Sequence, residues 1–173
     1  MSAKWRILTA GLAVTAGLAA LATAPLGAQE GPPPIAVEVL TQRATFTDDV
    51  RMQIKNKLDG QATMVMNLAD PSRVAIARIT VQPGAMFPWH THPGPVTVNV
   101  AEGELTYVQA SDCLPREYPA GTIFVDPGQG NVHTAFNSSD GVTVLYATFH
   151  DVPAEGPLTI PVDGPADCDV AAD

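Results

Sequence analysis

Positive charge is scarce in this sequence. Its 173 residues contain 9 lysines and arginines against 18 aspartates and glutamates, so the formal net charge is −9 with the histidines neutral. A surface of this sign repels nucleic-acid phosphates and anionic lipid headgroups. The composition therefore argues against nucleic acid and membrane surfaces as partners and favours a small-molecule ligand.

The motifs of several common enzyme classes are missing. The chain has no G-x-S-x-G elbow of a serine hydrolase, no phosphate-binding P-loop and no dinucleotide-binding glycine fingerprint. It has no internal repeat either. Any chemistry must therefore come from another set of side chains.

The sequence also lacks a segment with the apolar period of an amphipathic helix. Short alternating or β-branched segments are separated instead by glycine and proline turns. The clearest are residues 51–58, which precede an Asp59-Gly60 turn, and the apolar segments 74–81 and 142–149. This pattern is typical of an all-β sandwich or barrel.

Only one long apolar run is present, at residues 7–22. It follows Lys4 and Arg6 and precedes small residues that end at Ala28, which is the pattern of a secretory signal peptide. We predict that residues 1–28 are a signal peptide and that the protein is exported to the periplasm or the cell exterior, with no membrane contact after cleavage. The alternative is a retained anchor, although the run is shorter than the roughly 20 apolar residues of a membrane span.

Four segments are expected along the chain. The signal peptide is followed by an extended leader with a short edge strand near 35–40, which together occupy residues 29–50. A β-barrel follows at residues 51–150. Prolines at 153, 157, 161 and 165 forbid a long helix after it, so residues 151–173 are predicted to be a tail laid over the barrel.

Cysteine is rare. An exported chain with an even number of loop cysteines favours a disulfide, here between Cys113 and Cys168. Such a bond would tie the tail to the barrel and stabilise the fold by about 4 kcal/mol for a loop of about 55 residues. The alternative, two thiolate metal ligands, has less support because neither cysteine lies in a CxxC or CxH arrangement.

Three of the four histidines form a candidate metal site. His90 and His92 are two residues apart, so on an extended chain their imidazoles share one face. His133 follows a glycine turn and begins a strand-like segment that could bring a third imidazole to the same interior. Three neutral imidazoles are a known ligand set for divalent transition metals.

The spacing of these histidines resembles the two sequence motifs of cupins. The first motif, G-(X)5-H-X-H-(X)3-E-(X)6-G, is matched at Gly84, His90, His92 and Gly103, but Val96 stands where the glutamate is expected. The second, G-(X)5-P-X-G-(X)2-H-(X)3-N, is matched with one extra residue before the second glycine. Its matching residues are Gly121, Pro127, Gly130, His133 and Asn137.

The resemblance covers about residues 74–149 and implies a fold and a cofactor. The fold is the cupin jelly-roll barrel, or double-stranded β-helix. The implied cofactor is one divalent transition metal, namely Fe, Mn, Zn, Cu or Ni, bound by His90, His92 and His133. Both a monomer and a homodimer are compatible with the sequence.

The missing carboxylate bears on function. A three-histidine site leaves the metal its full +2 charge and an open position for water, hydroxide, an anionic substrate or dioxygen. Such sites resemble those of thiol and diketone dioxygenases among the cupins, so a dioxygenase-type oxidoreductase is our leading hypothesis. The alternatives are a non-catalytic ligand- or metal-binding cupin and a metal-assisted isomerase or hydrolytic enzyme.

Three further expectations concern the neighbourhood of the site. No general base is evident, because Asp126, Glu102 and Glu104 lie next to turns, where carboxylates are usually solvated. His150 matches no motif position and is expected at the surface. Aromatic side chains are expected either to line a pocket or to pack in the core; they are Phe87, Trp89, Tyr107, Phe124, Phe136 and Tyr146.

Overall fold

The computed structural model describes residues 31–68, 71 and 73–170. The predicted signal peptide lies outside these residues. The described part of the chain is all-β, with twelve strands and no helix, and none of it forms a helix able to cross a membrane. The strands are β1 (Ile35–Thr45), β2 (Met52–Asn56), β3 (Met64–Leu68), β4 (Arg73–Val81), β5 (His90–Thr91), β6 (Val96–Glu102), β7 (Glu104–Gln109), β8 (Pro115–Pro119), β9 (Thr122–Asp126), β10 (His133–Phe136), β11 (Thr143–Phe149) and β12 (Ile160–Pro161).

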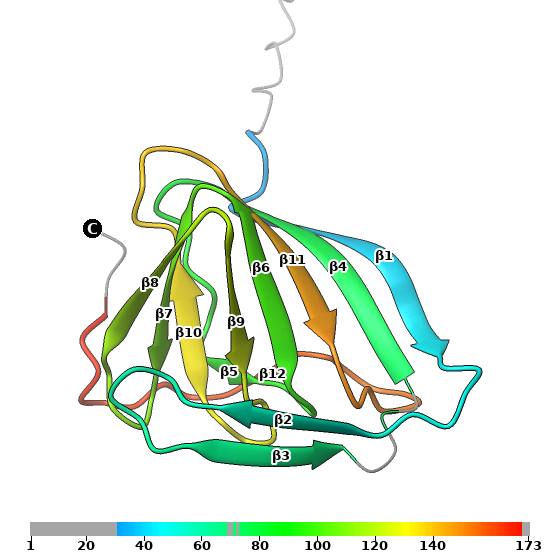
Figure 1. Ribbon diagram of the computed structural model, residues 1–173. Helices are drawn as coiled ribbons and strands as arrows, with labels where there is room; N and C mark the ends of the chain where they lie inside the picture. The colour runs from blue at the N-terminus through cyan, green and yellow to red at the C-terminus, as the bar shows by residue number, and fades with distance from the viewer. Residues whose placement is uncertain (1–30, 69–70, 72, 171–173) are drawn as a thin grey trace, which may run out of the picture. The chain divides into compact units, whose positions relative to one another are not determined.

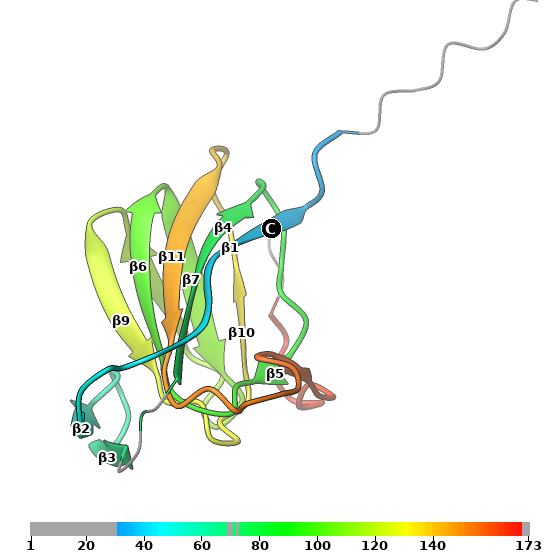
Figure 2. The same cartoon turned by 90° about the vertical axis from the view of Figure 1, so that its right-hand side faces the viewer.

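Two antiparallel sheets of five strands form the barrel. Their strand orders are β1-β4-β11-β6-β9 and β12-β5-β10-β7-β8. Figures 1 and 2 show the two sheets facing each other, with the β2–β3 hairpin at one end. This is the double-sheet arrangement of a jelly roll, so the predicted fold class is confirmed.

Alternation along the strands builds the core between the sheets. In β6, Val96, Val98 and Val100 are buried, whereas the residues between them are partly exposed. They pack with side chains of the facing sheet, among them Leu105 and Tyr107. Burying an aliphatic side chain of this size stabilises a fold by about 1.5–3 kcal/mol. The two-residue period of a strand thus places the three valines on the face that looks into the barrel.

The N-terminal strand is longer than expected. Strand β1 covers Ile35–Thr45 and pairs with β4 along its length, with irregular register on either side of Thr41. It is the edge of its sheet, as predicted, but it does not end near residue 40. The boundaries of the four predicted segments stay predictions.

The predicted hairpin at residues 51–68 is present, but it is not part of either barrel sheet. Strands β2 and β3 pair only with each other. The Asn56 side chain donates a hydrogen bond to the Val125 carbonyl at 2.8 Å, and Arg116 donates to the Asp59 carbonyl at 3.0 Å. These contacts hold the hairpin against the barrel.

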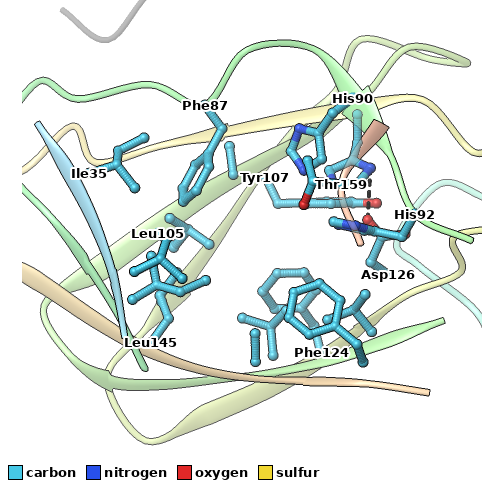
Figure 3. A pocket seen from close by; sticks show the side chains of 18 of the residues that line it. Ile35, Phe87, His90, His92, Leu105, Tyr107, Phe124, Asp126, Leu145 and Thr159 are labelled. Carbon is cyan, nitrogen blue, oxygen red and sulfur yellow. Dashed lines mark ion pairs between the residues drawn. The ribbon is translucent and has the colours of Figure 1, made fainter. Parts of the chain in front are cut away.

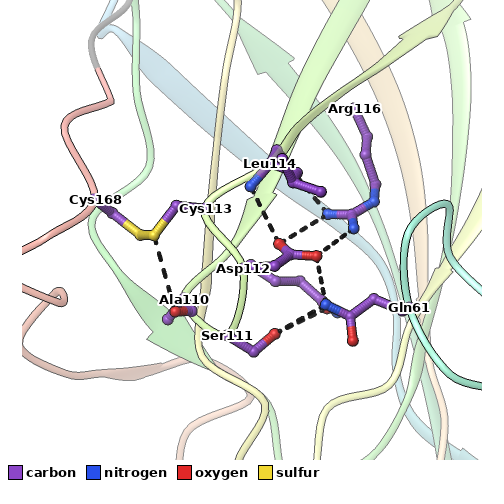
Figure 4. The surroundings of a disulfide bond; sticks show 9 residues. Gln61, Ala110, Ser111, Asp112, Cys113, Leu114, Arg116 and Cys168 are labelled. Carbon is purple, nitrogen blue, oxygen red and sulfur yellow. Dashed lines mark hydrogen bonds and ion pairs between the residues drawn. A yellow bond between two sulfur atoms is a disulfide. The ribbon is translucent and has the colours of Figure 1, made fainter.

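A disulfide joins Cys113 to Cys168, as predicted, with 5.4 Å between the Cα atoms. Figure 4 shows the bond beside the loop that precedes β8, where Asp112 pairs with Arg116 at 2.5 Å. The tail therefore returns to the barrel and is fastened there by a covalent bond.

Candidate metal centre

The barrel brings the three motif histidines together. His90 begins β5 and His133 begins β10, and the two are directly paired in the sheet. His92 follows β5. The ring centroids are 4.2 Å apart for His90 and His133, 4.9 Å for His90 and His92, and 5.1 Å for His92 and His133. One nitrogen from each ring lies within 4.8 Å of the others, and all three side chains are buried.

Each imidazole is held through its Nδ1 atom. The Nδ1 atoms of His90 and His92 lie 2.7 Å from the Pro88 carbonyl oxygen and 2.8 Å from the Leu158 carbonyl oxygen. These oxygens can only accept a hydrogen bond, so each Nδ1 carries the proton and each Nε2 keeps a free lone pair.

His133 has a neutral acceptor and a charged neighbour at Nδ1. The Nδ1 atom is hydrogen-bonded to the Asn131 carbonyl oxygen at 3.3 Å, and Asp126 Oδ2 lies 2.7 Å from the same atom as an ion-pair contact, although this oxygen has no well-aligned hydrogen bond. The Nε2 atom of this ring is therefore also free. Metal-binding histidines commonly use the second nitrogen in this way, and three ring nitrogens within 4.8 Å of one another fit a cation. Metal binding itself stays a prediction.

Burial keeps the imidazoles of His90 and His92 neutral. Removal from water, and then the nearby His133, lower the pKa of His90 from 6.5 to about 4. Removal from water also lowers the pKa of His92, against the opposing charge of Asp126. Because a metal binds the neutral form of imidazole, both side chains are ready for a ligand role at neutral pH.

Asp126 is the functional residue that sequence reasoning missed. It was expected to be solvated beside a turn, but its exposed fraction is only 1%. Burial raises the pKa of its carboxyl, but the contacts with His133 and with the Gly128 amide outweigh that effect and the net shift is downward. A signal was available, because Asp126 is two residues from the buried Phe124 on the same face of β9.

An apolar cavity of about 360 Å³ opens beside the histidines. Figure 3 shows His90, His92 and Asp126 at one end and apolar side chains around the remainder. The apolar lining comes from both sheets and includes Ile35, Phe87, Leu105, Phe124, Leu145 and Phe149. Among the described residues, no lysine or arginine lines this cavity.

Tyr107 is the remaining ionisable group in the cavity wall. Its hydroxyl accepts hydrogen bonds from the Gln109 amide at 3.2 Å and the Asn131 amide at 3.3 Å. Burial, with the negative charge of Asp126, raises the pKa of Tyr107 well above its usual value of 10. The phenol is therefore protonated, and its oxygen already accepts two hydrogen bonds.

The other expected residues fall in different places. His150 is half-buried, which corrects the prediction of a surface residue; its Nε2 lies 3.1 Å from Thr97 Oγ1 and it is not in the histidine cluster. Phe87, Tyr107 and Phe124 line the cavity, whereas Trp89 does not. Phe136, which is buried, and Tyr146, which is 40% exposed, do not line the cavity either.

One curated relative is an (R)-mandelonitrile lyase from Granulicella tundricola. It is 33% identical over 66 residues, which are 38% of this chain and 50% of the relative. The chain therefore matches only half the length of that protein.

Solved structures with partial similarity were also found. One, from Klebsiella pneumoniae, is a conserved protein with a double-stranded β-helix domain, with 25% identity, a TM-score of 0.43, and coverage of 47% of this chain and 70% of the other. Another is an oxalate oxidase with the substrate analogue glycolate, with 28% identity, a TM-score of 0.39, and coverage of 44% and 41%.

The family assignment rests on the sequence and on the arrangement of the motif residues. Residues 77–149 match the family model of the cupin domain. The match contains His90, His92 and His133, which the jelly roll brings together. Residues 77–149 of this chain are thus a cupin domain.

Proposed function

We propose that this protein is an exported cupin that binds one divalent transition metal through His90, His92 and His133. We further propose that it catalyses a dioxygenase-type oxidation of a small, mainly apolar molecule. The observation that carries the proposal is the apolar cavity that ends at three buried imidazoles. When bound, the metal would supply Lewis-acid or redox chemistry.

The ligand set supports a site that stays open to a substrate. Three imidazoles bring no charge to the metal, and Val96 rather than a carboxylate is buried at the cupin glutamate position. Nitrogen ligands of this kind suit Fe, Mn, Zn, Cu and Ni. A substrate with one anionic oxygen would be attracted by the uncompensated positive charge.

The cavity wall supports a compact substrate with an apolar body. Aromatic and aliphatic side chains would bury the body of the molecule and keep water away from the reacting end. No described lysine or arginine is available there to bind a second carboxylate or a phosphate. We therefore expect phenols, diketones or thiols rather than sugar phosphates.

Export is part of the proposal. The N-terminal pattern of basic and apolar residues motivates it, and the disulfide between Cys113 and Cys168 is consistent with an oxidising compartment.

A lyase is the second candidate, and the relative named (R)-mandelonitrile lyase motivates it. Such a reaction needs a base to take the substrate's hydroxyl proton. The ionisable cavity residues outside the three histidines are Asp126 and Tyr107, and both are engaged in hydrogen bonds or ion pairs. This observation favours oxidation over the lyase reaction.

Elemental analysis and two activity assays test the proposal. Protein purified without chelators or a metal-binding tag is expected to contain one divalent metal per chain and to consume dioxygen with a phenol, diketone or thiol. The His133→Ala variant is the control and should do neither. Cyanide release from mandelonitrile without oxygen uptake would favour the lyase, metal without any turnover would favour a binding protein, and absence of metal would refute the proposal.

A further inference from the structure

Val96 and Asp126 face each other across two neighbouring strands. Strands β6 and β9 are antiparallel, and Val96 pairs directly with Asp126 in their register. Both side chains are buried and both line the cavity. Directly opposed residues have Cβ atoms about 4.5–5.5 Å apart. A carboxylate is therefore present beside the position where the cupin motif has its glutamate, but it comes from the next strand.

We infer that Asp126 is a positioning residue of the metal centre and that it provides, from behind His133, the negative charge that Val96 does not provide as a ligand. The inference rests on the metal binding proposed above and adds a role for a side chain outside the motif ligands.

The two oxygens of Asp126 have different partners. Oδ1 accepts a hydrogen bond from the Gly128 backbone N–H at 2.6 Å, and Oδ2 lies 2.7 Å from His133 Nδ1. Because the Gly128 amide can only donate, it fixes the orientation of the carboxylate. The negative charge 2.7 Å away, together with the Asn131 carbonyl that accepts from Nδ1, favours the His133 proton on Nδ1 and leaves Nε2 free for a metal.

Only one of the three imidazoles is in direct contact with the charge. His90 and His92 meet only neutral backbone carbonyls at Nδ1. A negative charge behind an imidazole raises the basicity of its second nitrogen, so His133 should be the strongest donor of the three. Burial of an ion is costly unless a charge of opposite sign lies near it, and a cation at the three imidazoles would supply that charge.

The Asp126→Asn variant tests this role. Its amide keeps an oxygen for the Gly128 N–H, so its NH2 group faces His133 Nδ1 and two donors meet. The long hydrogen bond to the Asn131 carbonyl is then the remaining support for a proton on Nδ1, so we expect the proton to shift toward Nε2, the atom needed by the metal. We expect metal affinity to fall about 10- to 100-fold in a chelator competition assay, the usual range for loss of such a partner.

A matched control and a second measurement separate an effect on the His133 ring from an effect on folding. Asp112→Asn removes a carboxylate that pairs with Arg116 outside the cavity, and metal affinity should stay unchanged. In metal-free protein, ¹⁵N NMR should show His133 as the Nδ1–H form in the wild type and the Nε2–H form in Asp126→Asn. An Nε2–H form in the wild type would refute the positioning role, even if the variant does not fold.

A double-mutant cycle tests whether Asp126 provides the negative charge that is missing at Val96. Val96→Glu should raise metal affinity by a larger factor in the Asp126→Asn background than in the wild type, because only there is the carboxylate missing. If Val96→Glu raises metal affinity by the same factor in both backgrounds, the two carboxylates act independently. Asp126 would then not replace the charge of the missing glutamate. If the wild type binds no metal, the proposed function fails while the NMR result still decides the positioning role. If the wild type binds metal and Asp126→Asn binds it equally well, only this inference fails.

Discussion

His133 and His92 are held by two very different parts of the molecule. His133 is fixed by Asp126, which is buried in the barrel and lies seven positions earlier in the chain. His92 is fixed by the Leu158 carbonyl, which is 66 residues away on the C-terminal tail. One ligand thus depends on a charged side chain inside the barrel, and the other on a neutral backbone group that the tail brings to the site.

The tail segment 153–168, which we call the strap, has few buried side chains. All of its residues are partly or fully exposed. It is held by hydrogen bonds from Arg43 to the Pro153 and Gly156 carbonyls, by the pairing of β12 with β5, and by the disulfide at Cys168. Segments with little apolar burial open more easily than a packed core.

The strap is nonetheless part of the site. Thr159 lines the cavity and appears beside His90 in Figure 3. The Val162 N–H donates to the Trp89 carbonyl at 3.0 Å, next to the ligand segment. The comparison indicates that the barrel pairs His90 with His133, whereas the strap provides the partner of His92 and closes one side of the site.

Removing one of the three histidines should reduce metal binding more than any other change in the barrel or the strap. We expect His90→Ala, His92→Ala and His133→Ala each to lose most bound metal and to stay folded, because the three imidazoles are the only donors in the described cluster. Metal content and circular dichroism measure the two effects. His150→Ala is the control and should retain its metal. Full metal occupancy in His133→Ala would disprove the three-ligand site.

Val96→Glu should change the stability of the barrel strongly, and the sign of the change should depend on whether metal is bound. Without metal, it buries a second carboxylate opposite Asp126 and should cost several kcal/mol of folding free energy. With metal, it adds a ligand, so melting temperature should recover while azide binds more weakly. Melting curves with and without a divalent metal measure this. Equal destabilisation in both conditions would mean that Val96 does not face a metal.

Removing the disulfide should act mainly on the strap. We expect the Cys113→Ser, Cys168→Ser double variant to lose about 2–4 kcal/mol of stability and to bind metal a few-fold more weakly, because His92 loses a firmly held partner. Hydrogen exchange at the Val162 amide should become faster. Arg43→Ala, which loosens the other end of the strap, should have a smaller effect. Unchanged hydrogen exchange at the Val162 amide would contradict the conclusion that the disulfide holds the strap.

Mass spectrometry of the non-reduced, exported protein checks the bond directly. The expected mass is that of a chain with no free thiol, and two free thiols would contradict the structure.

Low pH should destabilise the metal-free protein, because the His90 imidazole is neutral in the folded state. The pKa of His90 is about 4 in the folded state and 6.5 in the unfolded state, so between these values only the unfolded chain takes up the proton. Stability is full above pH 6.5, falls as pH decreases toward 4, and is constant below that for this group. The loss from His90 alone is about 3 kcal/mol, and urea unfolding across this range measures it.

The sequence by itself determined the all-β class, the three histidines and the cysteine pair. Each depends on local information: alternation places Val96, Val98 and Val100 on one face, and motif spacing identifies His90, His92 and His133. The cysteines could be paired because the chain has only two.

Only the tertiary structure decided what surrounds the ligands. The burial of Asp126 depends on the pairing of β9 with β6, and neighbouring turns usually leave a carboxylate in water. The partner of His92 is the backbone carbonyl of Leu158, a group that every residue carries, so no residue type marks it in the sequence. The cavity likewise exists only where two sheets and the strap meet, because its volume is set by packing between segments far apart in the chain.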